Sequence, residues 1–327
     1  MINKKLFLNK DVLDPDCEFG SIRGGFGEAI LDCDCFCVSA DLAGSLKLNA
    51  FKEKFPERFF EVGVAEQNMV LFSAGLASKG TSVFACSFSV FSPGRNWEII
   101  RTSVCYNDVP VKIVGGHAGV ITGKDGATHQ MLEDIAITRV LPNMVVEVPC
   151  DYCEAKKATV EICNNKKPSY LRLIRPETRL ITTEKTPYTF GKAEVFYESE
   201  KPEILIIACG FMVGSALVAA DILEKKYNIG SVVLNNHTIK PMDSKTIIKY
   251  AKKCKGKVVC CEDHQIMGGM GSAVSEILSM SYPSLIGFIG IDDKFGESGF
   301  AYELIDEYNI SEKDILNKCL EILNFKK

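Results

Sequence analysis

Side chains that could carry chemistry recur at the ends of short apolar runs in the first half of the chain. Asp41 comes at the end of the run FCVSADL, Glu66 follows RFFEVG, and Phe88 and Phe91 lie just beyond SVFACS. Taken singly, each of these side chains would usually be a solvated group, a helix cap or a core residue. Carboxylates and aromatic rings at successive run ends favour a shared site instead.

The same pattern continues with imidazole and guanidinium groups. His117, Asp125 and His129 occupy the long segment after VPVKIVGG, and Arg175 follows SYLRLI. The chain has only four histidines, and two of them lie in this one segment. Loops at the carboxyl ends of parallel strands are where open α/β sheets bind ligands. Successive loops bearing these groups therefore predict one site to which all of them contribute.

Such a site requires a parallel sheet, and the first 175 residues predict one. Short β-rich runs alternate with helical patterns, which is typical of a parallel α/β domain. The strand candidates are FCVSADL, RFFEVG, SVFACS, VPVKIVGG, MVVEVP and SYLRLI.

The alternation occurs twice along the chain. Between Pro176 and Pro202 it breaks into a polar, turn-rich stretch, and after Pro202 the runs EILIIACG, SVVLNNHTI, KVVCCEDH and LIGFIGI alternate with helical segments again. We therefore predict an α/β fold of two parallel-type domains, residues 1–178 and 202–327, with a linker over residues 179–201.

Charge and hydropathy patterning exclude several classes of protein. A net charge of −4 and a pI near 5.7 provide no general attraction for nucleic acid, and no arginine-rich stripe provides one locally. The start, MINKKLFLNKDVLDPD, has no apolar run behind its charged beginning. We therefore expect no nucleic-acid binding, no membrane association and a cytoplasmic location.

The fourteen cysteines are interpreted as reduced core residues. A large chain without a secretion signal normally keeps its thiols reduced, and Cys33, Cys35 and Cys37 alternate as the buried side of a strand would. Cys150 and Cys153 form a CxxC, but no second pair at zinc-ligand spacing accompanies them. We expect no metal ligands among the residues of this chain.

Three common catalytic and nucleotide-binding motifs are missing. No G-x-G-x-x-G follows a predicted strand, and no GxxxxGK[ST] occurs, although GGFG and GGMG lie at expected helix starts. The Gly-x-Ser-x-Gly elbow is also absent, which removes the main hydrolase interpretation.

Residues 58–91, RFFEVGVAEQNMVLFSAGLASKGTSVFACSFSVF, resemble the pyrimidine-binding domain of transketolases. The likeness continues through GKDGATHQMLEDIAITRVLPNMVVEVPCD at residues 123–151, and residues 188–327 resemble the transketolase C-terminal domain. The resemblance implies thiamine diphosphate as the cofactor. Transketolases also have a domain that binds Mg²⁺ and the cofactor's diphosphate through a GDG motif, and this sequence has no match to it. The resemblance therefore implies an N-terminal transketolase subunit as partner, and it implies that Mg²⁺ is bound mainly by this partner.

By this resemblance Glu66 is a catalytic residue that contacts the cofactor. Its carboxylate would hydrogen-bond N1′ of the cofactor's aminopyrimidine ring and so help to activate the thiazolium carbon. Without the flanking motif, Glu66 would instead be taken for an acidic residue that stabilises the start of a helix.

The resemblance also implies an aromatic pocket for the aminopyrimidine ring. Phe88 and Phe91 match two of its aromatic positions, and Asp41 matches a position near the cofactor. The third aromatic position of the family falls at Gly94 in this chain. Trp97 or a side chain of the partner could fill that gap.

Substrate recognition is implied by a second group of matches. Asp125 matches a residue that contacts a substrate hydroxyl, and His129 matches a residue near the reacting centre that can move protons. A planar guanidinium can bind phosphate with two parallel hydrogen bonds. The positions that match those holding the sugar phosphate are Arg23, Ser45, His117 and Arg175.

The implied function is that of the C-terminal subunit of a split transketolase, which transfers a two-carbon ketol unit from a ketose phosphate to an aldose phosphate. A second copy of the heterodimer would complete a heterotetramer. One alternative is a 2-oxoacid dehydrogenase beta-type subunit, against which THQ followed by LEDIAITRVLPN argues. Deoxyxylulose phosphate synthase is normally one long chain. A noncatalytic binding or regulatory paralogue would not need the catalytic and substrate matches together.

The second domain contains its own group of polar residues. His237, Glu262, Asp263 and His264 lie near the glycine run GGMG at residues 268–271. Histidine beside carboxylates at strand ends is more often a satisfied structural network than a site. We expect no catalysis there.

Overall fold

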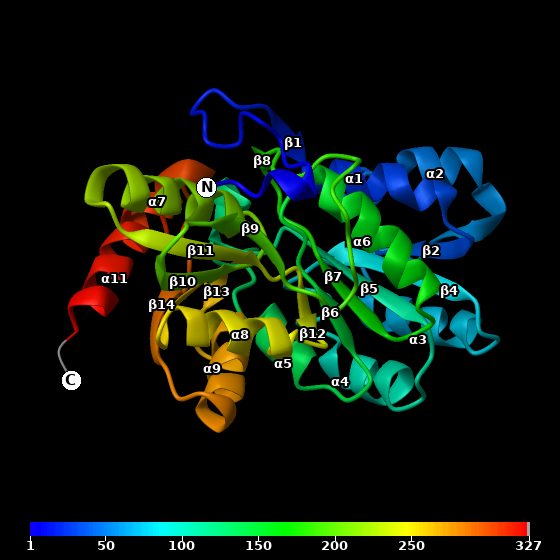
Figure 1. The fold of residues 1–327 in the computed structure, drawn as a ribbon. Coiled ribbons are helices and arrows are strands. Elements are labelled where there is room, and N and C mark those ends of the chain that lie inside the picture. The colour runs from blue at the N-terminus through cyan, green and yellow to red at the C-terminus, as the bar shows by residue number, and fades with distance from the viewer. Residues whose placement is uncertain (326–327) are drawn as a thin grey trace.

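The computed structural model describes residues 1–325, and its two larger sheets lie side by side (Figure 1). The larger sheet has the order β12-β6-β7-β5-β4-β2-β3, and β2 to β7 all run parallel. All six strands predicted for the first domain are therefore present. They are β2 (Cys35–Ser39), β3 (Phe59–Glu61), β4 (Ser82–Phe88), β5 (Val111–Gly116), β6 (Val145–Glu147) and β7 (Ser169–Arg172).

Helices cover both faces of this sheet. Figure 1 shows α1, α2 and α6 on one face and α3, α4 and α5 on the other. Because both faces are covered, the central strands β4 and β5 are buried along nearly their whole length, and their sequences are nearly continuous apolar runs. The helices are α1 (Ile22–Ala29), α2 (Asn49–Lys54), α3 (Glu66–Ala77), α4 (Trp97–Ile99), α5 (Asp134–Arg139) and α6 (Tyr152–Asn164).

Local side-chain caps start two of these helices. The Ser21 hydroxyl accepts a hydrogen bond from the Gly24 backbone N–H at 3.0 Å, and Asp151 accepts one from the Glu154 N–H at 2.8 Å. The two helices then pack closely, because a Cβ on Gly25 of α1 would lie 2.2 Å from the carbonyl oxygen of Tyr152 in α6. Glycine at this position allows the close approach of α1 to α6.

The second sheet has the order β14-β13-β10-β11-β9, with only β9 antiparallel. Its strands are β9 (Glu194–Glu198), β10 (Pro202–Ala208), β11 (Gly230–Asn235), β13 (Lys257–Gln265) and β14 (Leu285–Ile291). Its helices are α7 (Met212–Tyr227), α8 (Ser244–Lys253), α9 (Met270–Ser281), α10 (Ala301–Glu307) and α11 (Glu312–Asn324). Figure 1 shows α7 and α11 on one side of this sheet and α8 and α9 on the other.

The run SVVLNNHTI is divided between the two sheets. Its first part is β11, whereas its end forms β12 (Thr238–Lys240), which pairs antiparallel with β6 at the edge of the larger sheet. Part of the predicted linker over residues 179–201 is also ordered, since β9 pairs with β11. A separate two-stranded sheet pairs β1 (Phe19–Ser21) with β8 (Glu177–Arg179), near residue 178, where the first predicted domain ends. The two domains therefore share strands and are not connected by a single tether.

Short helical turns complete the chain. Four are 3₁₀ turns and one is a π-helical segment that continues α4. They are η1 (Lys4–Leu6), η2 (Ile30–Asp32), η3 (Pro56–Arg58), η5 (Val120–Asp125) and the π segment η4 (Ile100–Cys105). None of the helices within residues 1–325 is both long and apolar enough to span a membrane.

The cysteines lie in the core. All fourteen are unpaired, and all except Cys153, which is half-buried, are buried. Cys33, Cys35 and Cys37 pack in one apolar cluster as their alternation predicts, and the Cys37 sulfur lies 3.9 Å from that of Cys86. Within residues 1–325, no group of three or more His, Cys, Asp or Glu side chains is arranged to hold a metal ion.

A buried ion pair fixes the junction of the domains. Arg172 at the end of β7 donates to Asp134 of α5 at 2.8 Å, and both side chains are almost fully buried. The Tyr170 hydroxyl donates to the same carboxylate oxygen at 2.7 Å. A second nitrogen of Arg172 donates to the backbone carbonyl of Asp263 in β13 at 2.6 Å. The larger sheet, α5 and the second sheet meet at one guanidinium group.

Candidate functional site

The predicted site residues follow strands of the larger sheet at its carboxyl edge. Glu66 is the first residue of α3, Phe88 ends β4, His117 follows β5, and Arg175 lies three residues beyond β7. Because β2 to β7 are parallel, these ends share one edge. The topology therefore brings together loops that lie far apart in the sequence.

Two phenylalanines and two histidines form one cluster of rings. The Phe88 ring lies 3.8 Å from that of His117 and 6.3 Å from that of Phe91, measured between centroids. Phe91 meets His129 edge to face at 5.6 Å. The His129 Nδ1 atom lies 3.0 Å from the Thr128 hydroxyl, which fixes the tilt of the imidazole. The β4 and β5 loops thus build one aromatic wall.

His117 is held in an unusual environment. It adopts a left-handed backbone conformation with φ of 57°, is buried, and its Nδ1 atom has no hydrogen-bond partner within residues 1–325. Burial, and then the positive charges of Arg23 and Arg175, lower the pKa of His117 from 6.5 to about 3. The imidazole is therefore neutral at physiological pH and can donate or accept hydrogen bonds without charge.

Cationic groups gather beside this imidazole. Arg175 donates to the Asp125 carboxylate at 3.1 Å and to the Thr122 carbonyl at 3.0 Å. Arg23 donates to the Ser45 carbonyl at 2.5 Å and to the Arg175 carbonyl at 2.7 Å. Burial and the nearby Arg175 charge lower the pKa of Arg23. Two guanidinium groups close together favour the binding of an anion, which would offset their mutual repulsion.

Ser45 contributes differently from the expectation of a side chain that holds phosphate. Its backbone carbonyl orients Arg23, which is the one hydrogen bond that joins Ser45 to another predicted residue within residues 1–325. Arg23 is itself anchored by two carbonyls, and only its buried Nε atom has no partner. The structure thus brings Arg23 and Ser45 to the cluster, and both arginines are half-buried.

Glu66 lies at the other end of the site. Its side chain is 2% exposed, and its Oε2 atom has no hydrogen-bond partner within residues 1–325. The Arg95 guanidinium approaches that oxygen at 3.8 Å, and the Asn96 side chain donates to the Glu66 carbonyl at 3.0 Å. A buried carboxylate oxygen without a donor costs free energy, and a ligand donor at this position would remove that cost.

The sequence pattern gave no role to Arg95 and Asn96. Both lie in the turn after Phe91, since the Arg95 N–H donates to the Phe91 carbonyl at 3.0 Å and Asn96 also donates to Ser92 at 3.2 Å. This turn places Arg95 and Asn96 against Glu66. Their position directly beside Gly94, where the family pattern is interrupted, was the one available signal.

Gly94 leaves no room for an aromatic side chain. A Cβ at this position would lie 2.1 Å from the Val90 carbonyl oxygen, so the backbone turn itself requires glycine. Trp97 lies elsewhere: its indole N–H donates to the Ile137 carbonyl of α5 at 2.5 Å. The indole is therefore held against α5.

Asp41 stands apart from the other predicted residues. It is exposed, has φ of 62°, and its backbone N–H donates to Glu61 at 2.6 Å. No hydrogen bond or ion pair joins its side chain to another predicted residue in the described part of the chain. Its predicted place near the cofactor stays a prediction.

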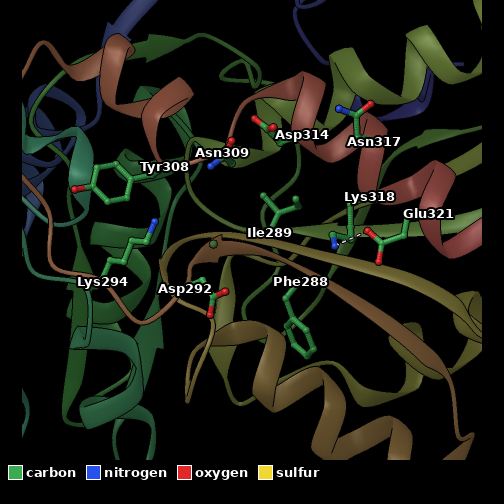
Figure 2. A pocket seen from close by; sticks show the side chains of 11 residues that line it. Phe288, Ile289, Asp292, Lys294, Tyr308, Asn309, Asp314, Asn317, Lys318 and Glu321 are labelled. Carbon is green, nitrogen blue, oxygen red and sulfur yellow. Dashed lines mark hydrogen bonds and ion pairs between the residues drawn. The ribbon is translucent and has the colours of Figure 1, made fainter.

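A separate cavity of about 400 Å³ lies at the outer edge of the second sheet, between β14 and α11 (Figure 2). Its lining includes Asp292, Lys294 and an ion pair of Lys318 with Glu321 at 2.6 Å. None of the predicted site residues lines it. The mixed charges of this cavity point to no single class of ligand.

Comparison with known proteins gives two family matches. Residues 29–180 match the transketolase pyrimidine binding domain, and residues 191–315 match the transketolase C-terminal domain. A Methanocaldococcus jannaschii protein named "Putative transketolase C-terminal section" is 43% identical over 93% of this chain and 96% of its own length.

Two further matches are a second curated protein and a solved structure. The 6-deoxy-6-sulfo-D-fructose transketolase subunit SqwH of Clostridium sp. (strain MSTE9) is 35% identical over 88% of each chain. A solved structure described as "Split gene transketolase, inactive beta4 tetramer" is 36% identical, with a TM-score of 0.87 over 94% of this chain and 100% of that chain. The predicted fold class is confirmed by these matches.

The low pKa of His117 gives a direct test of the site's electrostatics. We expect its imidazole resonances in the folded subunit to show no titration between pH 5 and 8, because the folded-state pKa is about 3. The unfolded chain takes up this proton near pH 6.5, so the contribution of His117 to stability is present above that pH and is lost as the pH falls towards 3.

NMR titration of the isolated subunit measures this, with His117→Gln used to assign the resonance. Arg23→Ala should raise the pKa of His117, because it removes one of the charges that oppose protonation. A wild-type midpoint between pH 6 and 7 would contradict the described burial of His117.

Proposed function

This chain belongs to the transketolase family, and on that premise we propose that it is the C-terminal subunit of a split, thiamine diphosphate-dependent transketolase. It would transfer a two-carbon ketol unit from a ketose phosphate to an aldose phosphate. The proposal rests mainly on Glu66, whose buried carboxylate has an oxygen without a hydrogen-bond partner within residues 1–325. Glu66 starts α3 at the same edge of the larger sheet as the Phe88 and Phe91 rings.

The residues present fit the aminopyrimidine half of this cofactor. Glu66 offers an acceptor to a ring nitrogen that carries a proton, and Phe88 and Phe91 offer half-buried aromatic surface for the ring itself. Thiamine diphosphate supplies a nucleophilic carbon that attacks the ketose carbonyl and stabilises the charge that develops there. Asp41 is proposed to lie at the rim of the same pocket.

Glu66 acts by holding a proton at the cofactor ring. Its burial excludes water from the carboxylate, so the hydrogen bond to the ring nitrogen forms in a medium of low dielectric constant, where it is stronger. Arg95, at 3.8 Å, partly balances the charge of Glu66 while its own side chain stays mostly exposed. The ion pair orients the carboxylate but leaves its Oε2 atom without a hydrogen bond in the described part of the chain.

The second end of the site is proposed to bind the sugar. Arg175 and Arg23 present positive charge to a terminal phosphate, and neutral His117 can donate to its oxygens. Asp125, held by Arg175, is placed to accept a hydrogen bond from a sugar hydroxyl. His129, beside Phe91, is proposed to move a proton at the reacting carbons.

The partner is proposed to be an N-terminal transketolase subunit that binds Mg²⁺ and the cofactor's diphosphate. This chain carries the pyrimidine binding and C-terminal domains and spans nearly the full length of relatives named as a section or subunit of a transketolase. A second copy of the pair would complete a heterotetramer. The similar solved structure is described as an inactive beta4 tetramer, which supports a chain that assembles without activity when alone.

Mixing the two subunits tests the function itself. The purified chain is assayed with thiamine diphosphate, Mg²⁺, xylulose 5-phosphate and ribose 5-phosphate, with and without the candidate partner. We expect activity only in the mixture, because the diphosphate and metal site lies in the partner. A proven complex that stays inactive with these and other ketoses would favour a noncatalytic paralogue.

Glu66→Gln tests the role assigned to the Glu66 carboxylate. It replaces the carboxylate with a neutral amide of the same size, so assembly should persist while turnover falls by about 10²-fold or more. Glu53→Gln, an exposed change on α2, is the matched control. Assembly is checked by light scattering. Near-normal turnover of the assembled Glu66→Gln complex would contradict the role assigned to Glu66.

Arg175→Ala tests the anion site by comparing sugars that differ only at their end group. Loss of charge-assisted hydrogen bonds of about 1.5–3 kcal/mol should reduce kcat/KM roughly 10- to 100-fold for a phosphorylated or sulfonated ketose. The unsubstituted ketose should be affected much less. Arg101→Ala serves as an exposed control, and equal losses for all sugars would indicate a structural arginine.

A further inference from the structure

The loop that carries His117, Asp125 and His129, here called the 117–130 loop, is held by the second domain. The Val120 backbone N–H donates to the Asp263 carboxylate of β13 at 3.0 Å. Strand β13 reaches this loop because it continues past its neighbour β10, whose last paired residue, Ala208, lies opposite Cys261. The end of β13 therefore extends past β10 towards the first domain while Gln265 still pairs with Ile291 of β14.

The opposite side of the loop is held by the segment before α10. The Gln130 side chain donates to the Glu297 carbonyl at 2.9 Å and also to the Val120 and Gly123 carbonyls within the loop. The Ser298 hydroxyl donates to the Lys124 carbonyl at 2.7 Å. The 117–130 loop is thus bonded to two separate parts of the second domain.

The Asp263 carboxylate is buried and only half of it is hydrogen-bonded within residues 1–325, which lowers the stability of the fold. Asp263 is 3% exposed, and while its Oδ1 atom accepts the Val120 N–H, its Oδ2 atom has no partner within residues 1–325. Burial raises the pKa of Asp263 to about 6, against the lowering effect of Arg172. A buried, half-satisfied carboxylate costs free energy, so packing alone gives no reason for an acid here.

The loop backbone is shaped to receive this carboxylate. A Cβ on Gly119 would lie 1.7 Å from the Asp263 Oδ2 atom, and Gly119 has φ of 82°. Glycine permits both the backbone conformation and the close approach. The contact begins only two residues after His117, so a shift of Asp263 would be transmitted directly to the substrate end of the site.

We propose that Asp263 is a positioning residue for the transferase: from the second domain, it sets the place of the 117–130 loop and thereby the affinity for the sugar substrate. This inference rests on the proposed function, because it assigns the loop's side chains to the substrate. Asp263 touches neither substrate nor cofactor and acts through Val120. The C-terminal domain then contributes to substrate recognition.

Asp263→Asn in the complex with the partner subunit tests the proposal. The variant should raise KM for the sugar phosphates with a loss in kcat/KM of roughly 10- to 100-fold, because small displacements of positioning groups have effects of that size. KM for thiamine diphosphate should rise much less than KM for the sugars, because Glu66 belongs to another loop and only Phe88 and Phe91 contact the 117–130 loop.

Glu262→Gln is the matched control. Glu262 is the neighbouring buried carboxylate on β13, but it accepts the Met270 and Gly271 N–H groups of α9 at 2.7 and 2.9 Å. This change should alter stability without changing KM for the sugars. Equal losses of sugar affinity in Glu262→Gln and Asp263→Asn would overturn the proposal.

Hydrogen exchange on the isolated subunit keeps the test independent of catalysis. The Val120 amide should exchange faster in Asp263→Asn, because the amide oxygen that remains is an uncharged and therefore weaker acceptor, and at the wild-type rate in Glu262→Gln. An unchanged Val120 rate would overturn the proposal, as would faster exchange with wild-type KM for both sugars. If the wild-type mixture has no transketolase activity, the proposed function fails, and the exchange rates still decide whether Asp263 holds the loop.

Ser298→Ala covers the case in which Asp263→Asn does not fold. Ser298 is exposed, so its loss should leave the fold intact, and it removes one hydrogen bond to the loop. A typical bond of this kind contributes about 0.5–1.5 kcal/mol, which corresponds to a KM increase of roughly 2- to 10-fold. An unchanged sugar KM in Ser298→Ala would then overturn the proposal.

Discussion

The guanidinium of Arg172 is buried where the two sheets meet, and a buried charge is tolerated only when its neighbours satisfy it. Asp134 neutralises this charge, and the Asp263 carbonyl accepts a further hydrogen bond. Removing one member would leave a charge without compensation, at a cost on the order of 3–5 kcal/mol. The requirement fixes α5, β7 and β13 relative to one another.

That fixed junction explains how the second domain can hold a site whose residues lie in the first domain. The 117–130 loop follows β5 of the larger sheet, and it is bonded to Asp263, Glu297 and Ser298 of the second domain. The strand β12, which leaves one sheet to join the other, ties the domains together from a further direction. The second domain therefore forms part of the frame of the site.

Several groups of the site lack the hydrogen bonds or charge compensation that a ligand could supply. The Glu66 Oε2 and His117 Nδ1 atoms are buried without a hydrogen-bond partner in the described part of the chain, and Arg23 and Arg175 lie close enough to repel each other. Each of these features raises the free energy of the chain alone and would be relieved by a bound ligand.

The sequence by itself determined the two-domain α/β class and the strands that precede Glu66, Phe88, His117 and Arg175, because buried parallel strands are written as short apolar runs. It could not show that SVVLNNHTI serves two sheets, since an apolar run carries no information about its neighbours. Nor could it show that Gly94 is dictated by a tight turn, or that Trp97 faces α5. The roles of Arg95, Asn96 and Asp263 depend on contacts between residues far apart in the chain or on the exact shape of a turn. Only the tertiary structure decides such contacts, because the distance between two side chains is set by the packing of whole elements.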